Sequence, residues 1–323
     1  MSTSGGTRAI IAALFANLGI AAAKFVAFLF TGSSSMLAES IHSVADSSNQ
    51  GLLLFGGRQA KRRPDEDHPF GYGRSRYFYA FVVAVVLFTL GSLFAFYEGW
   101  HKLQHTREHP GEGVEKPAIA IGVLVVAIML ETYSFRTAIV ESNRVRGSQS
   151  WVQFVRHSKS PELPVILLED LGAEVGLILA LIGVVLAAVT GNGLYDALGT
   201  MSIGVLLGVI AIILAIETKS LLLGEGASKP DVAKIKNAIT DDRDVSRLIH
   251  LKTLYLGPEE LLVAAKVQLG GHLSFADVSA AINRAEQRVR TAVPHARVMY
   301  LEPDSYDPNY VDPVPPDEAA AAH

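Results

Sequence analysis

The stretch Ala38-Glu39-Ser40-Ile41-His42-Ser43-Val44-Ala45-Asp46 places three side chains of metal-binding type inside a segment that is otherwise apolar enough to cross a bilayer. At helical spacing Glu39, His42 and Asp46 share one face. Ionisable groups at membrane depth are costly, so they usually face a cavity or one another and mark an ion or proton pathway. A polar helix contact is the simpler alternative. The pathway is favoured because a second acidic segment, 169–174, lies in another apolar span.

The composition indicates a membrane protein. The chain has 323 residues, 50% of them hydrophobic, and a mean hydropathy of +0.30, which is too apolar for an ordinary soluble domain of this length. A formal net charge of -4 gives no reason to expect nucleic acid as a partner. Because the chain has no cysteine, a metal must be held by His, Asp, Glu or backbone oxygen.

Six apolar runs are each long enough to span a bilayer, which takes about 20 residues. They cover residues 8–30, 35–57, 77–99, 117–140, 163–190 and 195–217. Basic residues gather after the second and fourth runs, so the positive-inside rule places both loops and the two termini in the cytoplasm. The start of the chain shows no cleavage site, and we expect the first run to be retained. The third run has no internal charge, and we expect it to be lipid-facing or interfacial.

Polar residues inside the other runs leave alternatives open. For Asn17 and Lys24 in the first run, packing or snorkelling is favoured over a role in the pathway. Asp196 opens the sixth run, where we expect a helix cap rather than part of an exit route.

The loop after the second run is dense in charge, proline and glycine, which predicts a structured loop. Asp65, Asp67 and His68 could hold a metal weakly at its surface, although charged loops are more often simply solvated. Asp65 and His68 are therefore kept as secondary metal candidates.

After Glu225 the composition changes to that of a soluble α+β module. The sequence predicts a helix over 231–240, strands over 246–255 and 261–269, a helix opened by a capping box at Ser274 and Asp277, and a last strand over 297–301. This αββαβ order suits a cytoplasmic ferredoxin-like domain. We expect a transport domain over 1–225, this domain over 226–305, and a disordered tail over 306–323.

Taken together, the six runs, the stretch 35–46, the loop His68-Pro69-Phe70-Gly71-Tyr72-Gly73, the acidic fifth run and the αββαβ module resemble the cation diffusion facilitator family. The resemblance runs from about Arg8 to Pro303. The residue sequence of the second run, together with Leu168-Glu169-Asp170, is most similar to the mitochondrial-type zinc exporter branch, which has bacterial members. The resemblance implies a homodimeric antiporter that exchanges a cytoplasmic divalent cation, usually zinc, for protons. We expect it in a bacterial cytoplasmic membrane.

The family pattern also implies a tetrahedral metal site between the second and fifth helices. His42 and Asp46 match the second-helix pair, and Asp170 matches one of the fifth-helix pair. The other fifth-helix position is Ile166, which cannot bind metal. Glu174, Glu39 or water could complete the site, and we expect Glu174, with Glu39 acting as a proton carrier or gate.

Two further metal sites of the family lack some or all of their ligand residues in this sequence. Tyr72 replaces the last ligand of the loop site that Asp65 and His68 otherwise match. The positions of the metal cluster in the soluble domain read Ile249, Ala265, Tyr300 and Glu302. We therefore expect that domain to mediate dimerisation without binding metal.

One neutral imidazole among carboxylates suits zinc, whereas an all-oxygen site would favour harder cations. Manganese, iron and cobalt are the alternative cargoes. An intramembrane metalloenzyme is the competing class, but the chain has no His-Glu-x-x-His motif and no recognisable nucleophile arrangement. The sequence thus predicts a transporter, not an enzyme, with Zn²⁺ as its substrate and no cofactor.

Overall fold

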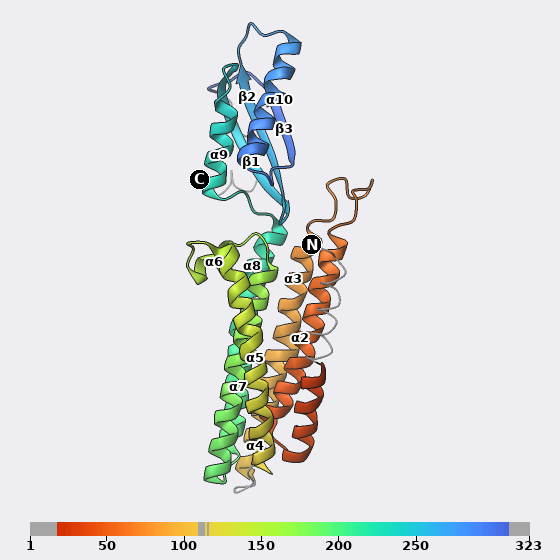
Figure 1. Ribbon diagram of the computed structural model, residues 1–323, viewed down its shortest axis with the longest axis vertical. Helices are drawn as coiled ribbons and strands as arrows, with labels where there is room; N and C mark the ends of the chain where they lie inside the picture. The colour runs from red at the N-terminus through yellow and green to blue at the C-terminus, as the bar shows by residue number, and fades with distance from the viewer. Residues whose placement is uncertain (1–17, 109–113, 115, 310–323) are drawn as a thin grey trace, which may run out of the picture. The chain divides into compact units, whose positions relative to one another are not determined.

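The computed structural model describes residues 18–108, 114 and 116–309 (Figure 1). The chain divides into two compact units, Met1–Gly224 and Glu225–His323. The first is helical and the second contains a three-stranded sheet. Asn17 and most of the tail expected to be disordered, from residue 310 on, lie outside the described residues.

The first unit is a bundle of long helices that run side by side (Figure 1). The described part of the first helix is Leu18–Thr31. The others are α2 (Ser34–Gln59), α3 (Ser75–Val86), the π-helical segment η1 (Leu87–Leu93), α4 (Phe94–Glu108), α5 (Pro117–Arg146), α6 (Trp151–His157), α7 (Glu162–Thr190) and α8 (Leu194–Leu223). Together α3, η1 and α4 make one continuous helix, Ser75–Glu108.

Among the described residues, four helices are long and apolar enough to cross a membrane: Ser75–Glu108, α5, α7 and α8. The described part of the first helix is apolar but short. Helix α2 has 26 residues, yet it carries many polar side chains, which are mostly buried in the bundle. Burial among other helices explains why α2 tolerates this polarity. A helical membrane domain is thus confirmed, and the count of six spans stays a prediction.

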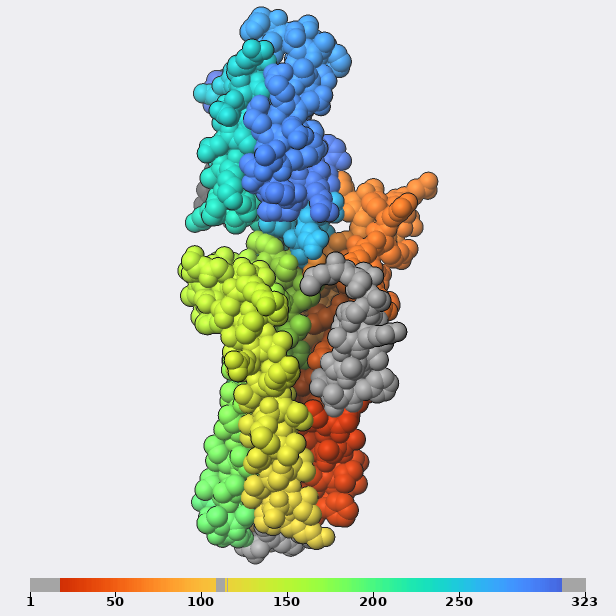
Figure 2. Space-filling view, viewed as in Figure 1, coloured from red at the N-terminus to blue at the C-terminus, as the bar shows by residue number. Residues whose placement is uncertain are grey.

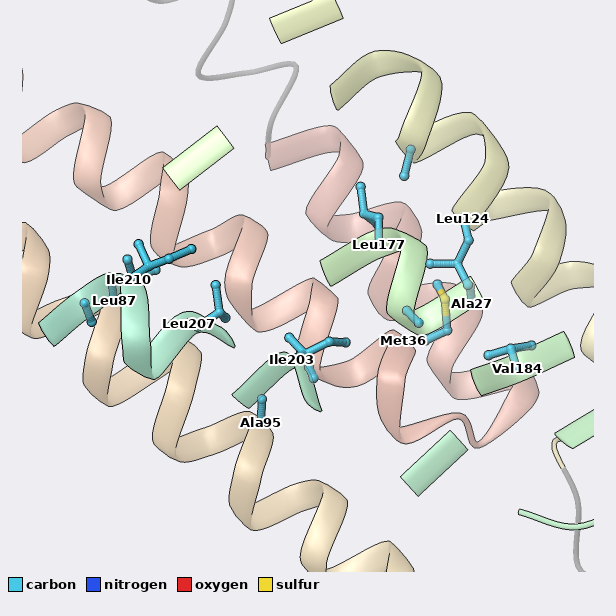
Figure 3. Close-up of a cluster of buried hydrophobic side chains, with 14 of the residues drawn as sticks. Ala27, Met36, Leu87, Ala95, Leu124, Leu177, Val184, Ile203, Leu207 and Ile210 are labelled. Atoms are coloured by element: carbon cyan, nitrogen blue, oxygen red, sulfur yellow. The ribbon is translucent and has the colours of Figure 1, made fainter. Parts of the chain in front are cut away.

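Apolar side chains from several helices fill the centre of the bundle. Figure 3 shows Met36 of α2, Leu177 of α7 and Ile203 and Leu207 of α8 in one buried cluster. Such residues gain free energy by leaving water or lipid for a close-packed interior. The core therefore joins α2, α7 and α8, and most of the candidate site residues come from α2 and α7.

The third predicted run does not only face lipid. Its helix packs on α8, where Ser92 Oγ donates a hydrogen bond to the carbonyl of Gly204 at 2.7 Å. The close approach depends on glycine, because a Cβ on Gly204 would lie 2.7 Å from Phe96 N and one on Gly208 would lie 2.7 Å from Ser92 Oγ. The uncharged run therefore also packs against α8, whose glycines allow the close approach.

Asp196 caps a helix, as expected, but the helix is not its own. It lies in the first turn of α8 and is fully buried. Its carboxylate accepts hydrogen bonds from the backbone N–H of Ser34 and from Ser33 Oγ, both at 2.9 Å. Ser34 begins α2, so Asp196 satisfies one of the free N–H groups of that helix across the bundle. This contact fixes the start of α2 to α8.

The second unit has the predicted αββαβ order. Its elements are α9 (Lys229–Thr240), β1 (Val245–Gly257), β2 (Glu260–Leu269), α10 (Phe275–Ala292) and β3 (Val298–Pro303). β1 and β2 form an antiparallel hairpin, and β3 adds parallel to β2. The apolar face of the sheet packs on the two helices, with Ile235 and Ile239 from α9 and Val289 from α10 fully buried.

A buried acid ties the turn after α9 to α10. Asp242 accepts hydrogen bonds from Arg284 at 3.0 Å and 3.1 Å and from Arg288 at 2.8 Å. The hydrogen bonds from Arg284 are the largest cause that holds the pKa of Asp242 well below its ordinary value of 3.8.

This low pKa predicts a pH dependence. A carboxyl group with a depressed folded-state pKa stabilises the fold above its unfolded pKa, and that contribution is lost as the pH falls through the folded pKa. We expect Asp242→Asn to lower the stability of the second unit at pH 7 by about 1–3 kcal/mol. The difference from wild type should shrink below about pH 4. Calorimetric unfolding of the full chain from pH 7 to pH 3 measures both, and parallel profiles for the two proteins would contradict the assignment.

Candidate functional site

Helix α2 carries three of the candidate residues into the bundle. Glu39 is fully buried, His42 is 1% exposed and the Asp46 side chain is 16% exposed. His42 Nε2 lies 3.5 Å from Asp46 Oδ2, one helical turn away. The shared face predicted from their spacing is thus confirmed for His42 and Asp46.

The His42 ring lies in a narrow space beside the π-helical segment. Neither ring nitrogen has a hydrogen-bond partner among the described residues. A Cβ on Gly91 of η1 would lie 3.8 Å from His42 Nδ1 and 3.1 Å from a Leu207 methyl group. Segments of π-helix are often found at functional sites. Buried polar atoms are normally paired, so an imidazole without a partner has ligand capacity to spare.

Two neighbouring acids on α7 face different helices. Glu169 Oε1 accepts a hydrogen bond from Asn49 Nδ2 at 2.8 Å, and its carboxyl group lies close enough to Asp46 for the two groups to interact. Asp170 Oδ2 accepts a hydrogen bond from Ser134 Oγ of α5 at 3.1 Å. Successive helical residues point about 100° apart, which accounts for the divergence.

Glu174 lies on the same side of α7 as Asp170. Its Oε1 accepts a hydrogen bond from Thr132 Oγ1 of α5 at 2.9 Å. Glu131, the residue before Thr132, lies close enough to Asp170 and Glu174 for their charges to interact. The α5 side of α7 therefore carries a second polar group, and Glu131 of this group also lies close enough to Asp46 for their charges to interact.

Glu39 is engaged by the first helix. Lys24 Nζ lies 3.1 Å from Glu39 Oε2 and donates a second hydrogen bond to Ser43 Oγ at 2.8 Å. Both charged side chains are buried, so of the two favoured alternatives Lys24 packs within the bundle and does not snorkel. Glu39 Oε1 has no hydrogen-bond partner among the described residues and approaches α7, since a Cβ on Gly176 would lie 3.0 Å from it.

Asp65 and His68 lie in a loop that closes on itself. Asp65 Oδ1 accepts the backbone N–H of His68 at 2.8 Å, and Asp65 Oδ2 accepts the Tyr72 hydroxyl at 2.6 Å. The Tyr72 hydrogen bond is the first cause that lowers the pKa of Asp65, and it raises the pKa of Tyr72. The imidazole of His68 also lies against the Tyr72 ring, with centroids 4.3 Å apart. These contacts engage both carboxylate oxygens of Asp65, and a metal role for Asp65 and His68 stays a prediction.

The structure thus brings His42 and Asp46 together and holds Asp170 and Glu174 against α5. Within the described ranges, no three His, Asp or Glu side chains form a group that could hold a metal ion. The sequence did not predict that Glu169 lies beside Asp46, although Glu169 belongs to the acidic segment 169–174. The signal was Asn49, whose amide on the same face of α2 requires a polar partner when buried.

Buried carboxyl groups and an imidazole among apolar helices are typical of an ion or proton pathway in a membrane protein. The chain belongs to the cation efflux family, because the family model described as the cation efflux transmembrane domain matches residues 10–223. It is a transporter rather than an enzyme.

Individual relatives agree with this family. The chain is 32% identical over 252 residues to a human protein named proton-coupled zinc antiporter SLC30A9, mitochondrial, covering 77% of this chain and 44% of the relative. It is 30% identical over 268 residues to metal tolerance protein C4 of Arabidopsis thaliana, covering 82% and 58%. The magnetosome protein MamB of Magnetospira is 23% identical over 289 residues, covering 90% and 92%. The chain thus spans about half the length of the first two relatives.

Proposed function

We propose that this protein exports Zn²⁺ from the cytoplasm in exchange for protons. The observation that carries the proposal is the buried pair of His42 and Asp46 on α2, with Glu169 of α7 facing Asp46. The name of the human relative, a proton-coupled zinc antiporter, supports the same cargo. Export of manganese, iron or cobalt by the same site is the second candidate.

The donor set favours zinc over harder cations. Zinc accepts imidazole nitrogen together with carboxylate oxygen in tetrahedral sites, whereas magnesium and calcium favour sites made of oxygen ligands. His42 would supply the nitrogen, and Asp46 would supply oxygen from the same face of α2. A carboxylate from α7 would supply the third ligand.

Proton exchange follows from the same ligands. A histidine or a carboxyl group must be deprotonated before it binds metal, so protons and Zn²⁺ compete for the site. Exchange also requires the site to open to each side of the membrane in turn. We propose that six spans form the pathway, that both termini and the second unit, which we assign to the ferredoxin-like type, lie in the cytoplasm, and that two copies form a dimer in a bacterial cytoplasmic membrane.

Reconstitution tests this function directly. Purified protein in proteoliposomes should move protons in the direction opposite to an imposed zinc gradient, measured with a pH-sensitive dye inside the vesicles. Manganese, iron and cobalt gradients serve as comparisons. The proposal is overturned if no gradient of any of these cations drives a proton flux. A larger proton flux with manganese than with zinc would assign manganese as the cargo.

The ligand from α7 can be tested separately. In the structure Glu169 faces Asp46, whereas Asp170 faces Ser134. We therefore expect Glu169→Gln to weaken equilibrium Zn²⁺ binding by about 100-fold, and Asp170→Asn by less than about tenfold. Isothermal titration of the purified variants at one pH gives both affinities.

A larger loss of Zn²⁺ affinity in Asp170→Asn than in Glu169→Gln would support Asp170 as the ligand, as the family pattern implies, with Glu174 beside it. It would also mean that α7 turns by about 100° before metal binds, because that is the angle between successive helical residues. Ser134→Ala is a suitable control, since it removes the hydrogen-bond partner of Asp170 without touching a carboxyl group.

A further inference from the structure

An apolar groove lies between α5, α6, α7 and α8. Its volume is about 790 Å³. Phe135 and Ile139 of α5, Leu168 and Leu171 of α7, and Ile213 of α8 line its walls, together with apolar residues of α6. The polar residues that the proposed transport function uses are not part of this lining.

The groove lies on a surface that faces the membrane. Helices α5, α7 and α8 are three of the four described helices long and apolar enough to cross a bilayer. Helix α6 joins the end of α5 to the start of α7 and stands out from the side of the bundle (Figure 2). Its Trp151 and Val152 side chains are exposed. Tryptophan and short amphipathic helices of this kind are typical of the boundary between lipid and water.

One end of the groove is basic. The Arg156 guanidinium is in the lining, its side chain is 67% exposed, and Nε lies 3.6 Å from Glu217. Residues 144–159 contain three arginines, one lysine and one histidine and no acid. The Arg146 guanidinium stacks on the Trp151 ring at 4.3 Å, which holds a second positive charge beside α6.

We propose that this groove binds one anionic phospholipid. Its phosphate would contact Arg156, and an acyl chain would lie against the apolar wall of α5, α7 and α8. The charge distribution favours this occupant, because a basic segment at the membrane surface attracts anionic headgroups, while the rest of the lining, apart from Glu217 beside Arg156, is apolar. A second copy of the chain suits the surface less well, since a two-fold contact centred on Arg156 would bring like charges together.

Lipid binding to the purified full-length protein tests the proposal. After delipidation in detergent, native mass spectrometry should show more bound phosphatidylglycerol than phosphatidylcholine at equal lipid concentration. Arg156→Gln should reduce that preference about fivefold, the effect of one basic residue near an anionic surface. Ile213→Trp should fill part of the groove and reduce the binding of both lipids.

Lys61→Gln is the matched control. Lys61 is an exposed basic residue in the loop after α2, outside the groove, and its removal should leave the lipid preference unchanged. Equal binding of the two lipids by the wild type would overturn the proposal, as would an unchanged preference in Arg156→Gln. If Ile213→Trp instead converts a dimer to a monomer and leaves lipid binding intact, the groove is an interface between copies and the lipid assignment is wrong. Lipid binding and oligomeric state are both measured without zinc transport, so these results do not depend on the proposed function.

Discussion

His42→Ala and Asp46→Ala should each reduce zinc-driven proton exchange to the level of empty liposomes. Each substitution removes a side chain that is proposed to bind the ion directly. Even loss of an outer partner of a metal ligand commonly costs 10–100-fold in affinity or activity, so we expect the loss of a ligand to exceed about 100-fold. The His42 nitrogens have no hydrogen-bond partner among the described residues, so removal of the ring breaks no hydrogen bond there.

Folding must be separated from function in this experiment. Both variants should elute as the wild type does in size-exclusion chromatography and keep its helical circular dichroism. Ser48→Ala is the control on the same helix, because Ser48 is exposed and its hydroxyl donates a hydrogen bond to the carbonyl of Val44, one turn earlier. Transport at the wild-type rate by either His42→Ala or Asp46→Ala would refute the site.

Lys24→Met should destabilise the bundle by about 3–5 kcal/mol, because it leaves the buried Glu39 carboxylate without its cation. The Glu39 side chain is inaccessible to solvent and cannot recover the lost interaction from water. Lys24→Met combined with Glu39→Gln removes both charges. We expect the double variant to recover most of the stability, since replacing a buried ion pair by neutral groups is often nearly neutral in free energy.

Thermal unfolding in detergent compares the two variants. A double variant no more stable than Lys24→Met alone would show that the pair is not the source of the effect. The same proteins also decide the role of Glu39. If Glu39 pairs with Lys24 and does not bind the metal, the double variant should bind Zn²⁺ with the affinity of the wild type. A large loss of affinity would indicate that Glu39 is a zinc ligand.

Local patterns in the sequence predicted much of the fold. The helical spacing of His42 and Asp46 correctly placed them on one face, because three to four residues make one turn whatever surrounds the helix. The alternation of apolar residues in β2 and the capping box at Ser274 likewise predicted the order of the second unit. These signals depend only on neighbours along the chain.

Contacts between distant residues could not be predicted in the same way. Lys24 and Glu39 belong to different helices, and their pairing depends on how the first helix turns against α2. The rotation of α7 decides whether Glu169 or Asp170 faces α2, and no local pattern determines it. The sequence did not predict helix α6, because its 7 residues are too few to show a clear helical period.

The cap that Asp196 provides makes the start of α2 a pivot. A rod held at one end moves least near that end and most at the other. His42 lies 8 positions from Ser34, or about 12 Å along the helix, whereas Gln59 lies about 38 Å away. A tilt of about 5° would thus displace His42 by roughly 1 Å and Gln59 by roughly 3 Å. A swing of α2 about its fixed end would therefore move Gln59 about three times as far as His42, where the ion is proposed to bind.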